Sequence, residues 1–99
     1  MAEGATFSYI RAVPTPFHAP VKRSITIAGH PTSISLEPVF WSALEGNAQD
    51  EGLPLSALVA RIDAERIRLS DPPNLASAIR VWLFDRATNG SSPTHLEPL

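Results

Sequence analysis

The sequence predicts a single small α+β domain whose elements follow the order strand, strand, helix, helix, helix. Two changes of pattern lead to this prediction. Residues 22–36 alternate polar and apolar side chains and are rich in β-branched types, which is typical of strands. From Glu37 onward the apolar residues recur with a period of about 3.6, which is typical of amphipathic helices. A chain of 99 residues is long enough for one such domain and too short for two separate cores.

Two short strands, 22–27 and 32–36, are predicted to form a hairpin. The residues between them, 28–31, are of types that form turns. If all four form the loop, Ile27 lies opposite Thr32. An isolated hairpin is barely stable in water, so this one must pack against other elements. The alternation places on one face Ile25, Ile27, Ile34 and Leu36, and on the other Thr26, Ser33 and Ser35.

The three predicted helices are bounded by residues that favour helix ends. Pro38 suits the first turn of the first helix, and Gly52 can adopt the left-handed conformation that ends it. The second helix is expected to begin near Pro54. Asn74 can cap the third helix through its side-chain oxygen, and the third helix is expected to end at Asn89-Gly90. The three apolar stripes are Phe40, Trp41, Leu44 and Ala48; Leu55, Leu58, Val59 and Ile62; and Leu75, Ile79, Trp82, Leu83 and Phe84.

Proline is concentrated near both ends of the chain. Of the ten prolines, three lie in the first twenty residues and two in the last seven. Because proline lacks a backbone donor and disfavours helix in the residue before it, both ends are poor candidates for regular structure. We expect residues 1–21 to form an extended, poorly ordered arm, residues 22–88 to form the domain, and residues 89–99 to form a flexible tail.

Three aromatic residues point to a second chain. A domain of roughly 67 residues has only a small core. Two helices and a ribbon cannot easily cover Trp41, Trp82 and Phe84 within one chain. We therefore expect an obligate homodimer that buries them, although tryptophans of this kind can also mark an exposed binding surface.

The composition excludes several classes of function. Without cysteine, the chain has no disulfide, thiolate metal site or cysteine nucleophile. A net charge of −2 excludes a strongly basic nucleic-acid coat but not a local basic patch. Three scattered histidines, and the lack of a nucleophile elbow or phosphate loop, predict no metal, no cofactor and no enzymatic activity. No apolar run approaches the roughly 20 residues that span a bilayer, and the amino terminus is unlike a secretory signal. We therefore expect a cytoplasmic protein with no membrane partner.

Two stretches carry a resemblance to a known family. In residues 34–44, ISLEPVFWSAL, a short alternating strand runs straight into an amphipathic helix. In residues 48–58, AQDEGLPLSAL, a turn leads into a second helix. Together they resemble the ribbon-helix-helix domain of the CopG, Arc and MetJ repressors. The fuller pattern, from Arg23 to Arg80, is similar to a bacterial branch of that family with an added leading strand and a third helix.

The resemblance implies an intertwined homodimer in which one strand from each chain pairs antiparallel across a two-fold axis. Ser33 and Ser35 then point outward, where family members that bind DNA read base edges in the major groove. The amino end of the second helix, at Ser56, would hold a phosphate through backbone N–H groups. The implied dimer core consists of Ile34, Leu36, Phe40, Leu44, Leu58, Val59 and Ile62.

The leading functional prediction is a small dimeric DNA-binding protein, a transcriptional regulator. Lys22 and Arg23 form a basic cluster near the ribbon that could contact phosphates, although such charges could equally keep an edge strand from pairing. Basic residues of the second helix are interspersed with acidic ones, which favours a self-paired surface. The predicted DNA-binding residues are Lys22, Arg23, Ser33, Ser35 and Ser56.

Several features leave a competing function open. Serine discriminates poorly between bases, Glu37 would be repelled by phosphates, and Pro54 offers no N–H. If the leading strand stays beside the ribbon, the dimer carries four strands and is too broad for a groove about 12 Å wide. The alternative is a protein-interaction or dimerisation module that keeps the fold without reading DNA. It includes an antitoxin-like role in which an arm or tail folds on a protein partner.

Overall fold

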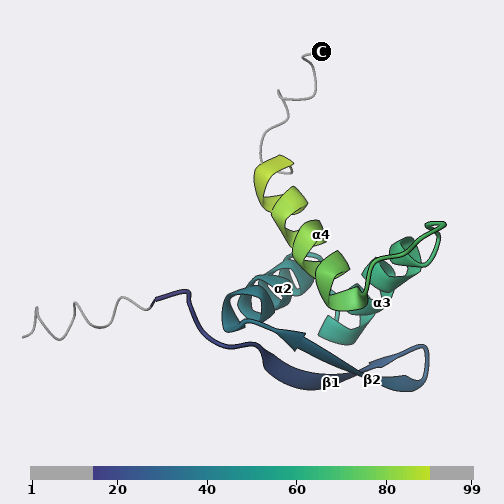
Figure 1. Cartoon of the computed structure of the whole chain (residues 1–99), viewed down its shortest axis with the longest axis horizontal. Coiled ribbons are helices and arrows are strands. Elements are labelled where there is room, and N and C mark those ends of the chain that lie inside the picture. The colour runs from purple at the N-terminus through teal and green to yellow at the C-terminus, as the bar shows by residue number, and fades with distance from the viewer. Residues whose placement is uncertain (1–14, 90–99) are drawn as a thin grey trace, which may run out of the picture.

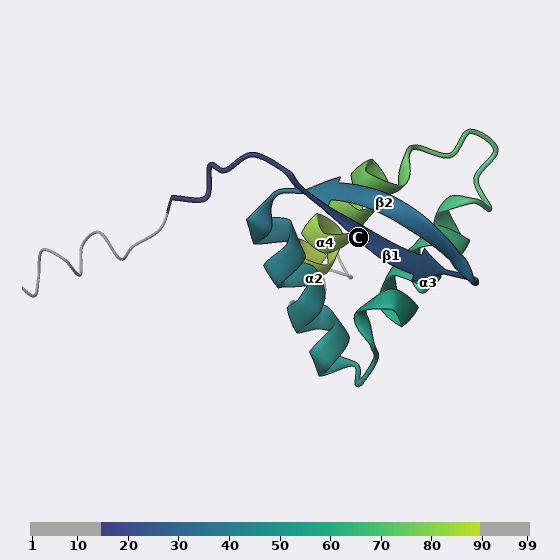
Figure 2. The same cartoon turned by 90° about the horizontal axis from the view of Figure 1, so that it is seen from below.

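In the computed structural model, residues 15–89 are described, and they form a hairpin followed by three helices (Figure 1). The hairpin is one layer, and the helices lie together on one of its faces, as the views from the side and from below show (Figure 1 and Figure 2). The predicted α+β order is confirmed. The elements are β1 (Val21–Ile27), β2 (His30–Leu36), α2 (Pro38–Asp50), α3 (Leu55–Arg66) and α4 (Leu75–Asn89).

A two-residue turn joins β1 to β2, and the predicted four-residue loop is wrong. Ala28 and Gly29 have φ values of 52° and 83°, and a type I′ turn requires positive φ at both positions. Ile27 therefore pairs with His30 and not with Thr32. Because the register shifts by an even number of residues, every side chain keeps the face that the alternation predicted. Alanine rarely adopts a positive φ, so the sequence did not indicate the tighter turn.

Pro31 is tolerated within β2 because its nitrogen faces away from β1. In a two-residue hairpin the pair that flanks the turn is hydrogen-bonded, and the two kinds of pair alternate from there. Pro31 and Thr26 therefore form a non-hydrogen-bonded pair. On the free edge of β2, the N–H groups that another strand could use are those of Ser33 and Ser35.

The helix ends follow the residues identified in the sequence. α2 begins at Pro38, and Gly52, just beyond its end, has a φ of 68°. α3 begins directly after Pro54. At the start of α4, the Ser77 N–H donates a 2.8 Å hydrogen bond to Oδ1 of Asn74. These predicted start and stop residues are therefore confirmed.

The core lies between the hairpin and the helices and is buried within one chain. Of the seven residues predicted to fill a shared dimer core, six are at most 3% exposed, and the seventh, Phe40, is partly buried. Their burial therefore does not require a second chain. The buried residues are Ile25, Ile27, Ile34, Leu36, Trp41, Leu44, Ala48, Leu58, Val59, Ile62, Ile79 and Leu83.

The expectation that one chain cannot cover its large aromatic residues is wrong for Trp41. Trp41 is 4% exposed, and its Nε1 donates a 2.9 Å hydrogen bond to the carbonyl oxygen of Val21. Trp82 is partly buried, whereas Phe84 is 68% exposed. The leading strand and α4 supply cover that two helices and a single ribbon strand lack. Phe84, predicted on the apolar stripe of the third helix, lies instead on its solvent side.

The described segment that precedes β1, residues 15–20, has no helix or strand and is exposed throughout. β1 begins at Val21, and α4 continues through Asn89. The remainder of the predicted arm, residues 1–14, and the predicted tail from Gly90 onward lie outside the described residues.

Candidate nucleic-acid interface

The face of the hairpin that is turned away from the helices is the surface on which DNA contact was predicted, and we call it the ribbon face. Its residues are exposed except Ser35, which is half-buried. The face therefore offers hydroxyl groups and one positive charge. Its six residues form three cross-strand pairs, Lys22 with Ser35, Ser24 with Ser33, and Thr26 with Pro31.

Arg23 lies on the opposite side of β1 from its neighbour Lys22. Its Nη1 is 3.1 Å from Oε2 of Glu45 in α2. Its guanidinium carbon lies 4.4 Å from the centroid of the Trp41 ring, a cation–π arrangement. Strand alternation therefore divides the predicted basic cluster. Lys22 belongs to the ribbon face, and Arg23 holds β1 against α2.

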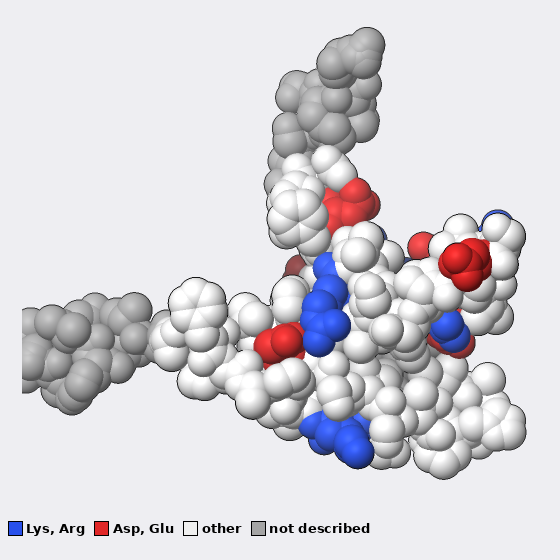
Figure 3. Space-filling view, in the orientation of Figure 1, with Lys and Arg blue, Asp and Glu red and all other residues white. Residues whose placement is uncertain are grey.

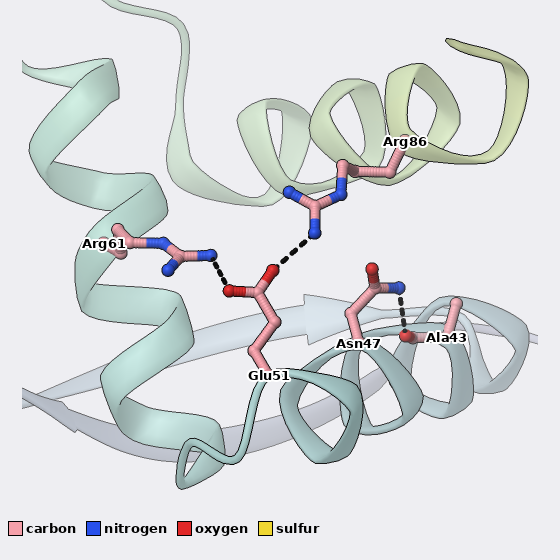
Figure 4. Close-up of polar contacts among 5 residues, drawn as sticks. All are labelled: Ala43, Asn47, Glu51, Arg61 and Arg86. Carbon is pink, nitrogen blue, oxygen red and sulfur yellow. Dashed lines mark hydrogen bonds and ion pairs between the residues drawn. The ribbon is translucent and has the colours of Figure 1, made fainter. Parts of the chain in front are cut away.

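Glu51, the residue that follows α2, joins three elements through two arginines (Figure 4). Its Oε1 accepts a 2.6 Å hydrogen bond from Nη2 of Arg61 in α3, and its Oε2 accepts one from Nη2 of Arg86 in α4. The hydrogen bonds from Arg61 and Arg86 hold the pKa of Glu51 below its ordinary value. Arg86 also lies 4.6 Å from the centroid of the Trp82 ring. The hydrogen bond from Arg86 to Glu51 therefore fixes the turn between α2 and α3 against α4.

Two more arginines are paired with carboxylates. Nη2 of Arg66 lies 2.8 Å from Oδ1 of Asp63, within α3. Nη2 of Arg80 in α4 lies 3.0 Å from Oε1 of Glu37, the residue between β2 and α2. A backbone hydrogen bond and the bond from Arg80 lower the pKa of Glu37. The negative charge of Glu37, which was expected to repel DNA phosphates, is therefore balanced by Arg80 within the fold.

Most of the positive charge of the described residues is neutralised by these contacts. Eight Lys and Arg residues occur in the chain, and seven of them lie between residues 15 and 89 because Arg11 lies outside. Five of the seven form ion pairs. Lys22 and Arg68 form none within the described part of the chain. The space-filling view accordingly shows small basic and acidic patches separated by uncharged surface (Figure 3).

Ser56, the remaining predicted contact, lies in the first turn of α3 and is half-buried. The N–H groups of Ala57 and Leu58 lie 3.0 and 3.2 Å from the carbonyl oxygen of Pro54. Because Pro54 has no N–H, the first donors of this turn are those of Leu55 and Ser56. Ser56 therefore lies on α3, whereas the residues of the ribbon face lie on β1 and β2.

Ser24 and Thr26 complete the ribbon face but were not among the predicted DNA-binding residues. The alternation in β1 was the signal that could have identified them. The ion pairs of Arg23 and Arg86 had no such signal, because their partners lie 22 and 35 positions away in the sequence.

A polar ribbon that leads through one residue into a pair of helices is the arrangement of small ribbon-helix-helix proteins, which are DNA-binding or regulatory. The family model for the ribbon-helix-helix domain matches residues 20–87, and the chain belongs to this family. Among solved structures, the chain is similar to an uncharacterized protein from Bordetella pertussis Tohama I. The two are 23% identical with a TM-score of 0.64, over 95% of this chain and 78% of that chain. At this identity the likeness supports the fold alone. No curated protein matches the chain.

Residues 15–89 lack two further kinds of feature. None of the helices in this stretch has the length and apolar character needed to cross a membrane. Nor are any three His, Cys, Asp or Glu side chains of these described residues grouped so that they could hold a metal ion.

Proposed function

We propose that this chain is a small DNA-binding regulator that contacts duplex DNA through its ribbon face. Membership of the ribbon-helix-helix family supports a DNA-binding or regulatory role. The main supporting observation is the ribbon face itself, which carries one lysine and four hydroxyl side chains and no acidic or aromatic residue. Two strands about 4.8 Å apart fit a major groove about 12 Å wide. The proposal has no catalytic step, and it places the protein in the bacterial cytoplasm.

Each predicted contact has a specific role in this proposal. Lys22 would neutralise a phosphate, while the hydroxyl groups of Ser33 and Ser35 would bond base edges. The first turn of α3, at Ser56, would hold a second phosphate through backbone N–H groups. Arg23 would act from the inner side, by holding β1 in place. Because serine bonds to either kind of base, we expect modest sequence discrimination.

A homodimer is part of the proposal, and the ribbon face is compatible with two forms of it. Pairing along the free edges of β2 gives the intertwined sheet of four strands. At about 4.8 Å per strand that sheet is wider than the groove, so β1 would have to move away as an arm. A dimer that leaves the β2 edge unpaired keeps each ribbon at two strands.

A protein-interaction module that does not read DNA is the second candidate function. The observation that favours it is the pairing of five of the seven described Lys and Arg side chains with carboxylates. DNA affinity depends on cations that are free to replace the counterions of the phosphates. A surface with few free cations and several hydroxyl groups suits a protein partner better than a duplex.

Selection of bound fragments from a mixed genomic pool at low salt tests the two candidates. A DNA-binding regulator should enrich a sequence motif, and its affinity, measured by fluorescence anisotropy, should fall as salt rises. Ser33→Glu should abolish this binding because it places a carboxylate on the ribbon face. Folded protein that binds no duplex at about 100 µM, the weak end of non-specific binding, would refute the proposal and favour the interaction module.

A further inference from the structure

The three cross-strand pairs of the ribbon face differ in chemistry along the hairpin. The pair nearest α2, Lys22 with Ser35, offers a positive charge and a hydroxyl group. The middle pair consists of two serines and offers two hydroxyl groups. The pair beside the turn, Thr26 with Pro31, brings a methyl group and a pyrrolidine ring to the same face. The ribbon face is therefore polar at one end and apolar at the other.

The register of the hairpin brings Thr26 and Pro31 together. A four-residue loop would have left Pro31 in the turn, whereas the observed two-residue turn pairs it with Thr26. Theirs is a non-hydrogen-bonded pair, and the side chains of such pairs lie closest, with Cβ atoms about 4.5–5.5 Å apart. Both residues are exposed. They therefore form one continuous apolar spot, which we call the tip pair.

The tip pair is accessible and is held together by contacts elsewhere in the hairpin. The turn between β1 and β2 lies at the edge of the molecule in both views (Figure 1 and Figure 2). At the other end of β1, Nε1 of Trp41 donates a 2.9 Å hydrogen bond to the carbonyl oxygen of Val21. Nη1 of Arg23 lies 3.1 Å from Oε2 of Glu45. These contacts keep β1 beside β2, so the two members of the tip pair stay adjacent.

We propose that the tip pair packs against the C5 methyl group of a pyrimidine in the major groove of DNA. Thymine presents this methyl group at its base edge, and apolar side-chain atoms such as the threonine methyl recognise it there. The same group occurs at the same position in 5-methylcytosine. Because serine bonds to either kind of base, the tip pair gives the ribbon face a preference that its hydroxyl groups lack. This inference rests on the proposed function, since it assigns a base feature to the same face.

The spacing of the pairs predicts where the methyl group lies relative to the other contacts. Successive pairs on one face are two residues, or about 6.8 Å, apart. Base pairs are about 3.4 Å apart along the duplex. With the ribbon along the groove, the methyl group therefore lies about two base pairs from the contacts of the serine pair. It lies about four base pairs from the phosphate that Lys22 would neutralise.

Replacement of thymine by uracil tests the proposal, because uracil lacks only the C5 methyl group. The affinity of the full chain is measured by fluorescence anisotropy at low salt for alternating A–T and A–U duplexes. The A–T duplex should bind about fourfold more tightly for each ribbon bound, which is the effect of burying about one methyl group. Alternating duplexes of guanine with cytosine or with 5-methylcytosine measure the same contact from the second source of the methyl group.

Thr26→Ser and Thr26→Val are a matched pair of variants on the exposed surface. Serine keeps the hydroxyl group and removes the methyl group, whereas valine keeps a methyl group and removes the hydroxyl group. The difference between methylated and unmethylated duplexes should therefore shrink in Thr26→Ser and persist in Thr26→Val. Thr88→Ser makes the same chemical change on α4, away from the ribbon face, and should leave the difference intact. Circular dichroism should show all three variants folded.

A position scan tests the spacing. In a fragment selected from the genomic pool, uracil is placed at one thymine at a time. Binding should weaken at a position about two base pairs from those where Ser33→Ala changes the base preference. Weakening at positions that show no fixed spacing from those of Ser33→Ala would contradict the contact.

The outcomes separate this inference from the proposed function. Equal affinity for the methylated and unmethylated members of both duplex pairs would overturn the inference and leave the proposed function standing. A difference that is unchanged in Thr26→Ser would also overturn it, because the difference would then come from the duplex itself. A difference confined to the cytosine duplexes would support the inference and identify 5-methylcytosine as the source of the methyl group. Folded protein that binds no duplex at about 100 µM would overturn the inference together with the proposed function.

Discussion

Lys22→Ala should reduce the salt dependence of DNA binding, and Arg23→Ala, one position further along, should not. Each phosphate that a Lys or Arg side chain neutralises adds about 0.9 to the slope of log affinity against log salt. Lys22 is on the ribbon face and has no ion pair within residues 15–89. Arg23 lies 3.1 Å from Glu45 and stacks over Trp41 on the inner side. Lys22→Ala should therefore lower the slope by about 0.9 for each ribbon bound.

The structure also limits the total effect. A slope of about 0.9 corresponds to a loss of affinity of about 3.5-fold between about 50 and 200 mM salt, and two ribbons would lose about twelvefold. Proteins that make 6–10 phosphate contacts lose about 10³- to 10⁵-fold over the same range. The described residues therefore predict weak, shallow salt dependence.

Fluorescence anisotropy of a labelled duplex, titrated at several salt concentrations, measures this slope. Arg23→Ala is the neighbouring control and should lower thermal stability while leaving the slope unchanged. An equal loss of slope in both variants would contradict the division of the two cations by strand alternation. An unchanged slope in Lys22→Ala would show that the ribbon face does not contact phosphate.

Three further predictions concern stability. Leu58 is fully buried, so Leu58→Ala should lower the free energy of unfolding by about 2–5 kcal/mol, and a loss under about 1 kcal/mol in urea unfolding would contradict its place in the core. Ala28→Gly should relieve about 1–2 kcal/mol of strain at the positive φ and should cost about 0.5–1 kcal/mol through the greater backbone entropy of glycine in the unfolded chain. The melting temperature should therefore rise or stay the same, and a lower melting temperature would contradict the type I′ turn. The pKa values of Glu37 and Glu51 lie below the ordinary 4.5. The cause at Glu37 is a backbone hydrogen bond together with the bond from Arg80, and the cause at Glu51 is the pair of bonds from Arg61 and Arg86. The stability that these two ionised carboxylates contribute should therefore be complete above pH about 5 and should be lost as pH falls through the lowered pKa values. Urea unfolding of Glu51→Gln at a series of pH values should show a smaller loss of stability in acid than the wild-type chain shows.

The features that depend on neighbouring residues were predictable from the sequence. The change of period at Glu37 separated the hairpin from the helices, because the periodicity of apolar residues follows the side that faces the core. Asn74 and Gly52 act through the backbone of the same helix end, so their residue types were sufficient. The hairpin register was the local exception, since it depends on a positive φ at an alanine.

The candidate site was predictable in part. Alternation along β2 correctly indicated that the side chains of Ser33 and Ser35 lie on the face of the hairpin that is turned away from the core. It did not show which basic side chains remain free. Arg23 was grouped with Lys22 because the two are adjacent in sequence, although adjacent strand residues point to opposite faces.

By itself, the sequence determined which residues are apolar and with what period, and these two properties determine the order of elements and the inward side of each. The tertiary structure decided which charges are neutralised and which apolar side chains stay exposed. Arg23 with Glu45 and Arg80 with Glu37 meet across 22 and 43 sequence positions. Phe84 remains exposed because the other helices pack on the opposite side of α4. Both outcomes depend on contacts between distant segments, about which a local pattern of residue types carries no information.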